Sequence, residues 1–380
     1  MKKTKILAIY YPQFHSIPEN DLAWGKGFTD WVNVKKASPL FEKHYQPRIP
    51  LNCNYYDLAL DNNILPQQVD LATQYGIDGF CFYHYWFDGK LLLNTPIENF
   101  LHNKNLNMSF CLSWANETWS KRWIGDTKTV IQLQEHTPDN RIWIKHFNYL
   151  IKFFSDNRYI KIDNKPVFII YQPILIRELN KLLDFWQDLA IKNGFNGMYY
   201  IFTKRHDYLP SNILSLSNGI LKFQPQEIYN SNLFKGKKPI FNILSNRLRF
   251  LPERIIDYIY QFRYKFETFK RYDSNLIWEY ILKDAYSINQ PFQGDIYESA
   301  YVNWDNTPRY GKNATIFSHV EPMEFETYFH ELYKKAIENE SEFLFINAWN
   351  EWAEGAYLEP DEKYEFKYLN SIKRVLEHYK

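Results

Sequence analysis

The sequence Phe343-Leu-Phe-Ile-Asn-Ala-Trp-Asn-Glu-Trp-Ala-Glu-Gly355 joins a short apolar run directly to a polar motif. A run of four large apolar residues is typical of a buried strand, and the polar residues that follow predict the end of that strand. The motif places Glu351 and Glu354 three residues apart, with Trp349 and Trp352 beside them. We therefore expect two carboxylates at the carboxyl end of a strand.

The same pattern, a β-rich run followed by polar residues, recurs along the chain and predicts eight strands. Segments with helical periodicity lie between several of these runs, and alternating strands and helices predict a parallel sheet. Eight strands indicate an α/β fold of the (β/α)₈ (TIM) barrel type with long insertions and an active site at its carboxyl-terminal rim. The expected strands are 6–14, 78–86, 108–115, 166–172, 198–203, 219–223, about 298–303 and 343–350, and the expected helices are 61–75, 136–155, 176–193, 321–339 and 362–380.

Six of the expected strands run into polar and aromatic motifs near their carboxyl ends. Taken alone, each motif fits a strand cap or a core aromatic residue as well as a site. Because the carboxyl ends of barrel strands meet at one rim, their shared position predicts a functional site there. The motifs are Tyr11–His15, Tyr83–Trp86, Trp114–Glu117, Tyr171–Gln172, Trp304–Thr307 with Arg309, and Asn350–Glu351.

Glu351 and Glu354 are the candidate catalytic residues. Breaking a glycosidic bond requires a protonated acid for the departing oxygen and an ionised carboxylate as base or nucleophile. Burial and mutual repulsion can separate two such pKa values, so one site can hold both forms near neutral pH. The alternative interpretation is that both are solvated loop carboxylates. Asn350, the two tryptophans, Gly355 and the acidic tail Leu358–Asp361 favour the catalytic interpretation.

The composition of the 380 residues excludes some classes of function. A net charge of +1 argues against a nucleic-acid-binding protein. Three cysteines without a Cys-x-x-Cys pair indicate a reducing compartment, and His15, His44 and His84 lack zinc-ligand spacing, so we expect neither metal nor cofactor. Ile6–Tyr11 is too short for a signal sequence, and no apolar stretch is long enough to span a bilayer. We expect a cytoplasmic protein.

Two connections are longer than is usual in a barrel. Residues 15–60 contain Trp24-Gly-Lys-Gly-Phe-Thr-Asp-Trp31 and Tyr45–Pro47, which suit the wall of a cleft. Residues 225–293 form a basic, aromatic-rich insertion, in which 235–271 holds ten Lys or Arg against three acidic residues. This tract is either a solvated helical face or a contact for an anionic partner, such as a membrane surface or a lipid-linked glycan.

These motifs resemble the WbsX-type proteins, bacterial proteins linked to O-antigen and capsule biosynthesis. The likeness covers nearly the whole chain in order, apart from 225–293, and implies a single barrel domain over 1–380 that is similar to glycoside hydrolase family 99. It is carried by Ile9–His15, Asn20 with Trp24–Trp31, His44–Pro47, Gly79–Trp86, Trp114–Glu117 with Trp119, Trp304–Asn306 and Asn347–Gly355.

The similarity to glycoside hydrolase family 99, the endo-α-mannosidases and endomannanases, rests mainly on Asn350–Gly355. It implies a retaining reaction in which the base, Glu351, deprotonates the sugar's own 2-hydroxyl to give a 1,2-anhydro intermediate and Glu354 donates the proton. This sequence has Ala353 where the mannosidases usually have His, which leaves the substrate open.

We therefore expect an enzyme that cleaves or transfers a glycosidic bond in bacterial surface polysaccharide, O-antigen or lipopolysaccharide metabolism. The alternatives are a glycosyltransferase that uses a sugar nucleotide, although neither Asp-x-Asp nor a Gly-x-Gly-x-x-Gly loop is present, and a non-catalytic glycan-binding barrel. The expected partner is an oligosaccharide or lipid-linked glycan. The expected substrate-binding residues are His84, Trp86, Trp114, Asn116, Glu117, Trp119, Tyr171, Trp304, Asp305 and Asn350.

Overall fold

The computed structural model describes residues 3–126, 128–206, 208–231, 269–283, 292–318 and 321–379. Its main sheet is parallel, in the order β12-β10-β9-β8-β4-β2-β1-β15-β13. The strands are β1 (Lys5–Tyr10), β2 (Gly79–Phe87), β4 (Ser109–Trp114), β8 (Lys165–Ile170), β9 (Tyr199–Lys204), β10 (Gly219–Lys222), β12 (Asp295–Tyr297), β13 (Ser299–Tyr301) and β15 (Phe343–Asn347).

The two ends of this sheet belong to one segment of chain. Only Glu298 separates β12, which pairs with β10, from β13, which pairs with β15. Taken as one broken strand, the two complete a ring of eight parallel strands within the described residues. The predicted (β/α)₈ barrel is confirmed, and each of the eight predicted runs contains or overlaps a barrel strand.

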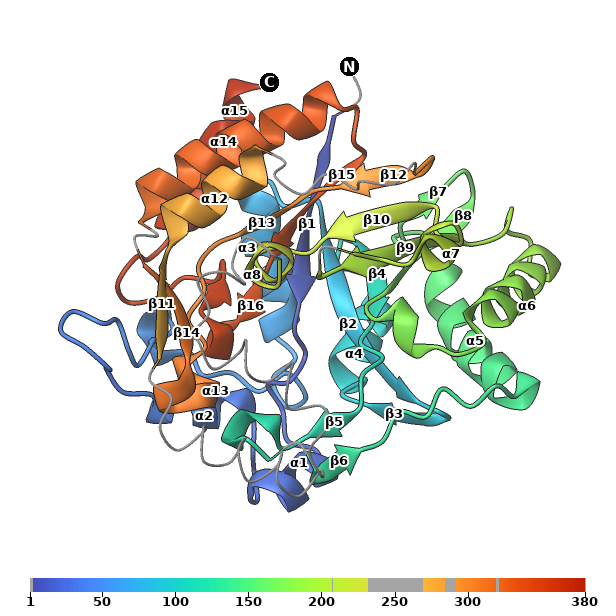
Figure 1. Cartoon of the computed structure of the whole chain (residues 1–380), viewed down its shortest axis with the longest axis horizontal. Helices are drawn as coiled ribbons and strands as arrows, with labels where there is room; N and C mark the ends of the chain where they lie inside the picture. The colour runs from blue at the N-terminus through green and yellow to red at the C-terminus, as the bar shows by residue number, and fades with distance from the viewer. Residues whose placement is uncertain are drawn as a thin grey trace, which may run out of the picture.

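The helices cover the outside of the barrel (Figure 1). The five predicted helical segments contain α3 (Ile64–Gln74), α5 (Asn140–Phe154), α6 (Leu179–Lys192), α14 (Pro322–Glu338) and α15 (Lys367–His378). Sequence reasoning missed α4 (Thr95–His102) and α12 (Ser274–Leu282), which are short and show fewer repeats of the helical period.

Helix α12 shows where the 225–293 region rejoins the barrel. Trp278 of α12 stacks between Tyr301 of β13 and Tyr328 of α14, with ring centroids 4.9 and 5.5 Å away. The end of this region is therefore part of the helical layer. Most of the basic tract, 235–268, lies outside the described residues, so the predicted membrane contact stays a prediction.

The loops that follow the strands gather at the end of the barrel opposite both chain termini (Figure 1). Small elements in these loops and between the strands complete the fold. No helix in the described ranges is both long and apolar enough to cross a membrane. The small elements are α1 (Pro18–Trp24), α2 (Asp30–Lys36), β3 (Lys90–Leu92), β5 (Trp119–Ser120), β6 (Val130–Gln132), β7 (Lys161–Ile162), α7 (Ser211–Leu214), α8 (Gln226–Tyr229), β11 (Lys270–Asp273), α13 (Thr307–Tyr310), β14 (Thr315–Ser318), β16 (Asn350–Glu351) and β17 (Ala356–Tyr357), with 3₁₀ turns at Leu51–Cys53, Arg122–Ile124, Pro173–Leu175, Gly311–Asn313 and Trp352–Glu354.

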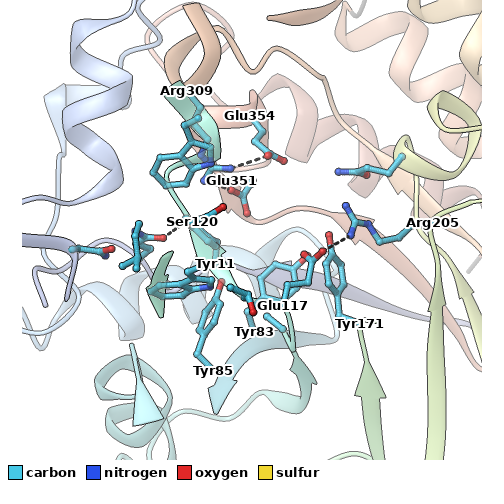
Figure 2. A pocket seen from close by; sticks show the side chains of 18 of the residues that line it. Tyr11, Tyr83, Tyr85, Glu117, Ser120, Tyr171, Arg205, Arg309, Glu351 and Glu354 are labelled. Carbon is cyan, nitrogen blue, oxygen red and sulfur yellow. Dashed lines mark hydrogen bonds and ion pairs between the residues drawn. The ribbon is translucent and has the colours of Figure 1, made fainter. Parts of the chain in front are cut away.

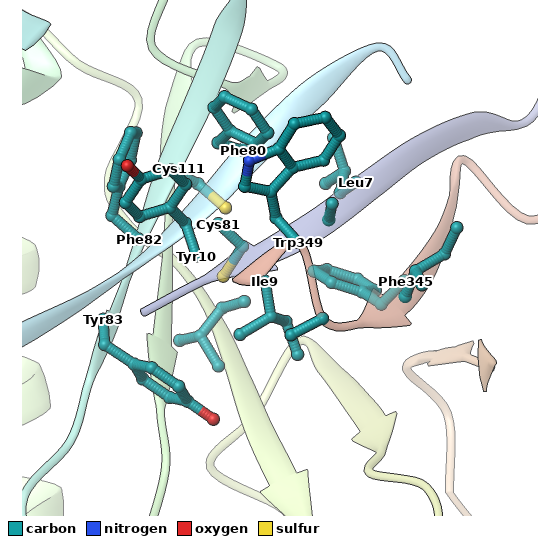
Figure 3. Close-up of a cluster of buried hydrophobic side chains, with 14 of the residues drawn as sticks. Leu7, Ile9, Tyr10, Phe80, Cys81, Phe82, Tyr83, Cys111, Phe345 and Trp349 are labelled. Carbon is teal, nitrogen blue, oxygen red and sulfur yellow. The ribbon is translucent and has the colours of Figure 1, made fainter. Parts of the chain in front are cut away.

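The core includes aromatic and aliphatic side chains of β1, β2, β4 and β15 (Figure 3). Trp349 is fully buried in it, with its ring centroid 5.3 Å from that of Phe80. Cys81 and Cys111 are free, buried and paired in register across β2 and β4. The tryptophan nearest to the strand end therefore stabilises the barrel and is not part of a cleft wall.

Gly79 marks a close approach of three strands and generates a prediction about stability. A Cβ atom here would lie 2.7 Å from the carbonyl oxygen of Ser109 and 2.9 Å from Leu7 Cδ2. We expect Gly79→Ala to destabilise the fold by about 1–3 kcal/mol, because the neighbouring backbone has to move. Urea unfolding measures this loss, and an unchanged midpoint would contradict the close approach.

Candidate active site at the carboxyl-terminal rim

The main cavity at the rim has a volume of about 240 Å³ and is walled by aromatic and charged side chains. Figure 2 shows the two glutamates at one side of it and Glu117 with Arg205 at another. Aromatic faces combined with a few charged groups are typical of sites that bind a partly apolar, hydroxyl-rich ligand. The aromatic residues are Tyr11, Trp24, Tyr83, Tyr85, Trp119, Trp123, Tyr171, Phe223 and Tyr310, and the charged residues are Glu117, Arg205, Arg309, Glu351 and Glu354.

Backbone and amide contacts hold the motif after β15 in place. The Trp349 backbone N–H donates to the Ile9 carbonyl at 2.7 Å, which keeps the motif beside β1. The Asn350 side chain accepts from the Tyr11 N–H at 2.7 Å and donates to the Tyr11 carbonyl at 2.9 Å. Asn350 thus acts like a further strand residue that clamps β1 to the motif, which leaves Glu351 at the mouth of the barrel.

A tight hairpin then turns the chain so that Glu354 also faces the cavity. Strands β16 and β17 pair around the turn, and Gly355 between them has a φ of +68°, a conformation that favours glycine. The Asp305 backbone N–H donates to the Glu354 carbonyl at 2.7 Å. The loop after β13 therefore fixes the backbone that carries the second carboxylate.

Arg309 joins the two carboxylates. Its Nη2 lies 2.6 Å from Glu351 Oε1 and its Nη1 lies 2.8 Å from Glu354 Oε1. The same Nη2 donates to Asp30 Oδ2 at 2.5 Å. The guanidinium also lies 4.9 Å from the centre of the Trp123 ring and 5.2 Å from that of Tyr11. One buried cation therefore contacts three carboxylates from two separate segments, α2 and the β16–β17 hairpin.

Burial governs the proton affinity of this cluster. The side chains of Glu351 and Glu354 are 7% and 21% exposed. Burial raises the pKa of both carboxyls above the ordinary value; the Arg309 charge lowers each pKa, whereas the charge of Asp30 raises it again. Because the three carboxylates outnumber the one guanidinium, the pair favours holding a proton, as an acid catalyst requires.

A second ion pair faces the glutamates across the cavity. Arg205 Nη1 lies 3.4 Å from Glu117 Oε1, and the guanidinium lies 4.4 Å from the centre of the Tyr171 ring. Gln172 Nε2 also donates to Glu117 Oε1 at 3.3 Å. These long contacts at a partly exposed position can exchange for the hydroxyls of a ligand.

Some of the sequence-predicted residues come together at this cavity. Glu351, Glu354, Glu117, Trp119 and Tyr171 all line it. The 15–60 connection contributes Asn20 and Trp24 to the wall, in agreement with the prediction that it lines a cleft.

His84, Trp86 and Trp114 do not line the cavity. Trp86 stacks on His146 of α5 at 4.5 Å between ring centroids, and its carbonyl accepts from the indole N–H of Trp114 at 3.1 Å. Burial lowers the pKa of His84 to about 3. Successive residues of a strand face opposite sides, so Tyr83 and Tyr85 take the cavity side and His84 and Trp86 face the helices.

The remaining four predicted binding residues are structural. Asn350 is the clamp on β1, and Asn116 makes an equivalent clamp, because it accepts from the Gln172 N–H at 2.8 Å and donates to the Gln172 carbonyl at 2.9 Å. Asp305 accepts hydrogen bonds from His44 and Gln46 at 2.8 and 2.7 Å. Trp304 packs on Phe317. These side chains are at most 7% exposed and hold loops together.

The acidic tail after the motif also serves the fold. Glu359 accepts hydrogen bonds from Tyr56 at 2.8 Å and from Gln68 and Trp352 at 2.6 Å, and burial raises its pKa to about 7. Asp361 accepts from the Tyr357 hydroxyl at 2.6 Å. Trp352 therefore supports the hairpin from behind, and its ring does not face the cavity.

Sequence reasoning missed several cavity residues. These include Arg205 and also Arg309, which comes after the expected strand near 298–303 but has no predicted role. Asp30, which contacts Arg309 without lining the cavity, is not predicted either. The alternation of a strand is a signal that can identify Tyr83 and Tyr85 once one cavity-facing position is known. In the described part of the chain, no group of three or more His, Cys, Asp or Glu side chains is arranged to hold a metal ion.

The Arg309 cluster predicts a large, pH-dependent loss of stability. Arg309→Gln leaves buried carboxylates without a counter-charge, and we expect a loss of roughly 3–5 kcal/mol near neutral pH. The loss grows as pH rises from 5 to 8, because the folded variant then holds protons that its unfolded form releases.

Chemical denaturation at the two pH values measures this effect. The matched control is Arg374→Gln, which removes an exposed ion pair with Glu326 and is expected to cost less than about 1 kcal/mol. Equal losses for the two variants at both pH values would contradict the buried cluster.

Comparison with known proteins agrees with this architecture. A family model described as glycosyltransferase WbsX matches residues 6–372. Two curated relatives, each described as uncharacterized protein WxcX, come from Xanthomonas campestris pv. campestris strains B100 and ATCC 33913. They are 30% identical to this chain over 377 and 376 residues, which cover 98% of the chain. The chain spans about half the length of these relatives, 49% of each.

Solved structures share the fold at low sequence identity. The GH99 endo-α-mannosidase from Bacteroides thetaiotaomicron matches in complex with bis-tris-propane, with a TM-score of 0.57, and in a second structure, with 0.56; both are 13% identical and the match covers 100% of this chain and 98% of that protein. A glycoside hydrolase-like protein matches with a TM-score of 0.54 at 13% identity, over 99% of this chain and 94% of the other. With a family match over nearly its whole length and a barrel of the GH99 fold, the chain belongs to the glycosyltransferase WbsX family.

Proposed function

We propose that this protein cleaves or transfers a glycosidic bond with retention of configuration, with Glu354 as the acid and Glu351 as the base. The observation that carries the proposal is the position of both carboxylates in one aromatic cavity, bound to the same guanidinium. Contact with the two terminal nitrogens of one guanidinium holds the two carboxylates beside each other. Glu354 is the more exposed of the two and so the better placed to reach a departing oxygen.

The charges of the site favour one proton on the glutamate pair, which these roles require. Glu351, Glu354 and Asp30 share one cation, so a proton on Glu354 relieves repulsion inside the cluster. Arg309 contacts both glutamates and favours the ionised form of each, while burial raises the pKa of Glu351 to about 8. In the proposed reaction Glu351 takes the proton of the 2-hydroxyl, the 2-oxygen bonds to the anomeric carbon, and the proton of Glu354 moves to the departing oxygen. Water or a second sugar hydroxyl then opens the intermediate.

The proposed substrate is a bacterial surface polysaccharide or its lipid-linked precursor, handled in the cytoplasm or at the inner face of the membrane. The family description and the resemblance to O-antigen and capsule proteins support this assignment. Tyr83, Tyr85 and Tyr171 offer ring faces for sugar stacking, while Glu117 and Arg205 offer acceptors and donors for hydroxyls.

A second candidate function is transfer from a sugar nucleotide, favoured by the family description and by two arginines in the cavity. Both guanidiniums already contact carboxylates, which leaves little positive charge for a diphosphate. Calorimetry with a panel of nucleotide sugars separates the two functions. Saturable binding of one nucleotide sugar would replace the first proposal with the second.

The roles assigned to the two glutamates predict how two variants differ in activity. We expect Glu351→Gln and Glu354→Gln each to lower turnover of a cleaved glycan on the order of 10²–10⁴-fold, because each removes a positioned proton carrier. An aryl glycoside with an acidic phenol needs little protonation, so it restores much of the rate of Glu354→Gln but not of Glu351→Gln.

Mass spectrometry of products from the source organism's surface glycan, with turnover rates, measures both effects. The matched control is Glu338→Gln on the surface of α14, which is expected to keep full activity. Near-full turnover in both site variants would refute the assignment. Glycan binding by the wild-type protein without hydrolysis or transfer would instead indicate a non-catalytic glycan-binding barrel.

A further inference from the structure

Asp30 is the third carboxylate of the Arg309 cluster and does not itself line the cavity. It opens helix α2 in the connection between β1 and α3, within the Gly-Phe-Thr-Asp-Trp sequence that ends at Trp31. Its side chain is 0% exposed, donates nothing, and accepts from Arg309 and, at 2.9 Å, from the Asn33 amide. A residue this deeply buried reaches a substrate only through its neighbours.

Asp30 and Glu351 use the same nitrogen. Asp30 Oδ2 and Glu351 Oε1 lie 2.5 and 2.6 Å from Arg309 Nη2, while Glu354 uses the other terminal nitrogen at 2.8 Å. Because the two carboxylates share one donor, the positive charge available to Glu351 is divided between them. Trp123 and Tyr11 lie against the guanidinium, with ring centroids 4.9 and 5.2 Å away.

We propose that Asp30 is a positioning residue that acts through Arg309: it orients the guanidinium between the two glutamates and keeps one proton on that pair. This role deepens the proposed function, on which its catalytic consequence rests. A guanidinium with no third partner would neutralise the glutamates more completely and leave the site without its acid.

The other groups that face the glutamate pair do not perform this task. They are Tyr11 after β1, Tyr83 and Tyr85 of β2, Glu117 after β4, Tyr171 after β8 and Arg205 after β9. Burial raises the pKa of Tyr11, Tyr83, Tyr85 and Tyr171, so these hydroxyls stay neutral, and Arg205 is paired with Glu117. Asp30 is thus the anion that contacts Arg309 without lining the cavity.

The test is Asp30→Asn, which keeps the size of the side chain and removes its charge. Since the Asp30 charge raises the pKa of Glu351 and Glu354, its removal lowers them, and the acid loses its proton at a lower pH. We expect the high-pH limb of kcat/KM to move toward acid on the order of one pH unit. Asp30→Glu keeps the charge and is expected to restore most of the wild-type profile.

Carbon-13 NMR of carboxyl-labelled glutamate gives a readout that does not depend on turnover. The two glutamate signals, assigned with Glu351→Gln and Glu354→Gln, are expected to titrate at lower pH in Asp30→Asn than in the wild type. The control is Asp184→Asn on the exposed face of α6, which is expected to leave both titrations unchanged. If the signals shift although no glycan is turned over, this inference stands and the proposed function fails. If turnover is present but the signals and the pH profile do not shift, Asp30 has only a structural role.

Melting curves show whether Asp30→Asn folds, and Asp30→Ser is the substitute if it does not. The wild-type protein supplies a test that needs no variant: at pH 7 the glutamate pair is expected to retain a proton. Two fully ionised carboxyl signals at that pH would overturn the inference.

Discussion

The contact of one buried guanidinium with three carboxylates is the constraint around which the rim is built. Moving charged groups out of water is costly unless each finds a partner with good geometry. Arg309 meets this condition only if α2, α13 and the β16–β17 hairpin all occupy their observed positions. The cluster therefore ties the loop after β1 to the loops after β13 and β15. Its excess of negative charge suits it to proton transfer.

Two asparagine side chains link the ends of the barrel strands to the loops that carry the cavity residues. Asn350 and Asn116 each bond both the N–H and the carbonyl of a residue just beyond a neighbouring strand, Tyr11 and Gln172. An amide side chain can donate and accept at once, as a backbone peptide does, so it extends the sheet where the strands have ended. Both residues look like ligand-binding groups in the sequence, yet they position the residues that face the cavity.

The high aromatic content is divided between two tasks by the alternation of each strand. Tyr83 and Tyr85 face the cavity, while His84 and Trp86 between and beside them pack against α5. Trp349 fills the core below the motif, and Trp352 stacks on Tyr357 behind it. Seven of the nine aromatic residues of the cavity wall thus come from the first half of the chain, and the tryptophans of the glutamate motif hold that motif rigid.

The sequence by itself determined the barrel and the position of Glu351 and Glu354 at its rim, because these follow from local periodicity and from the meeting of parallel strands at one edge. Only the tertiary structure decided which neighbours share the cavity. Asp30 and Arg309 are 279 residues apart, and no local pattern encodes their contact. The side of the sheet on which His84 or Tyr83 falls depends on how the strand is set against its neighbours, and a shift of one residue reverses it.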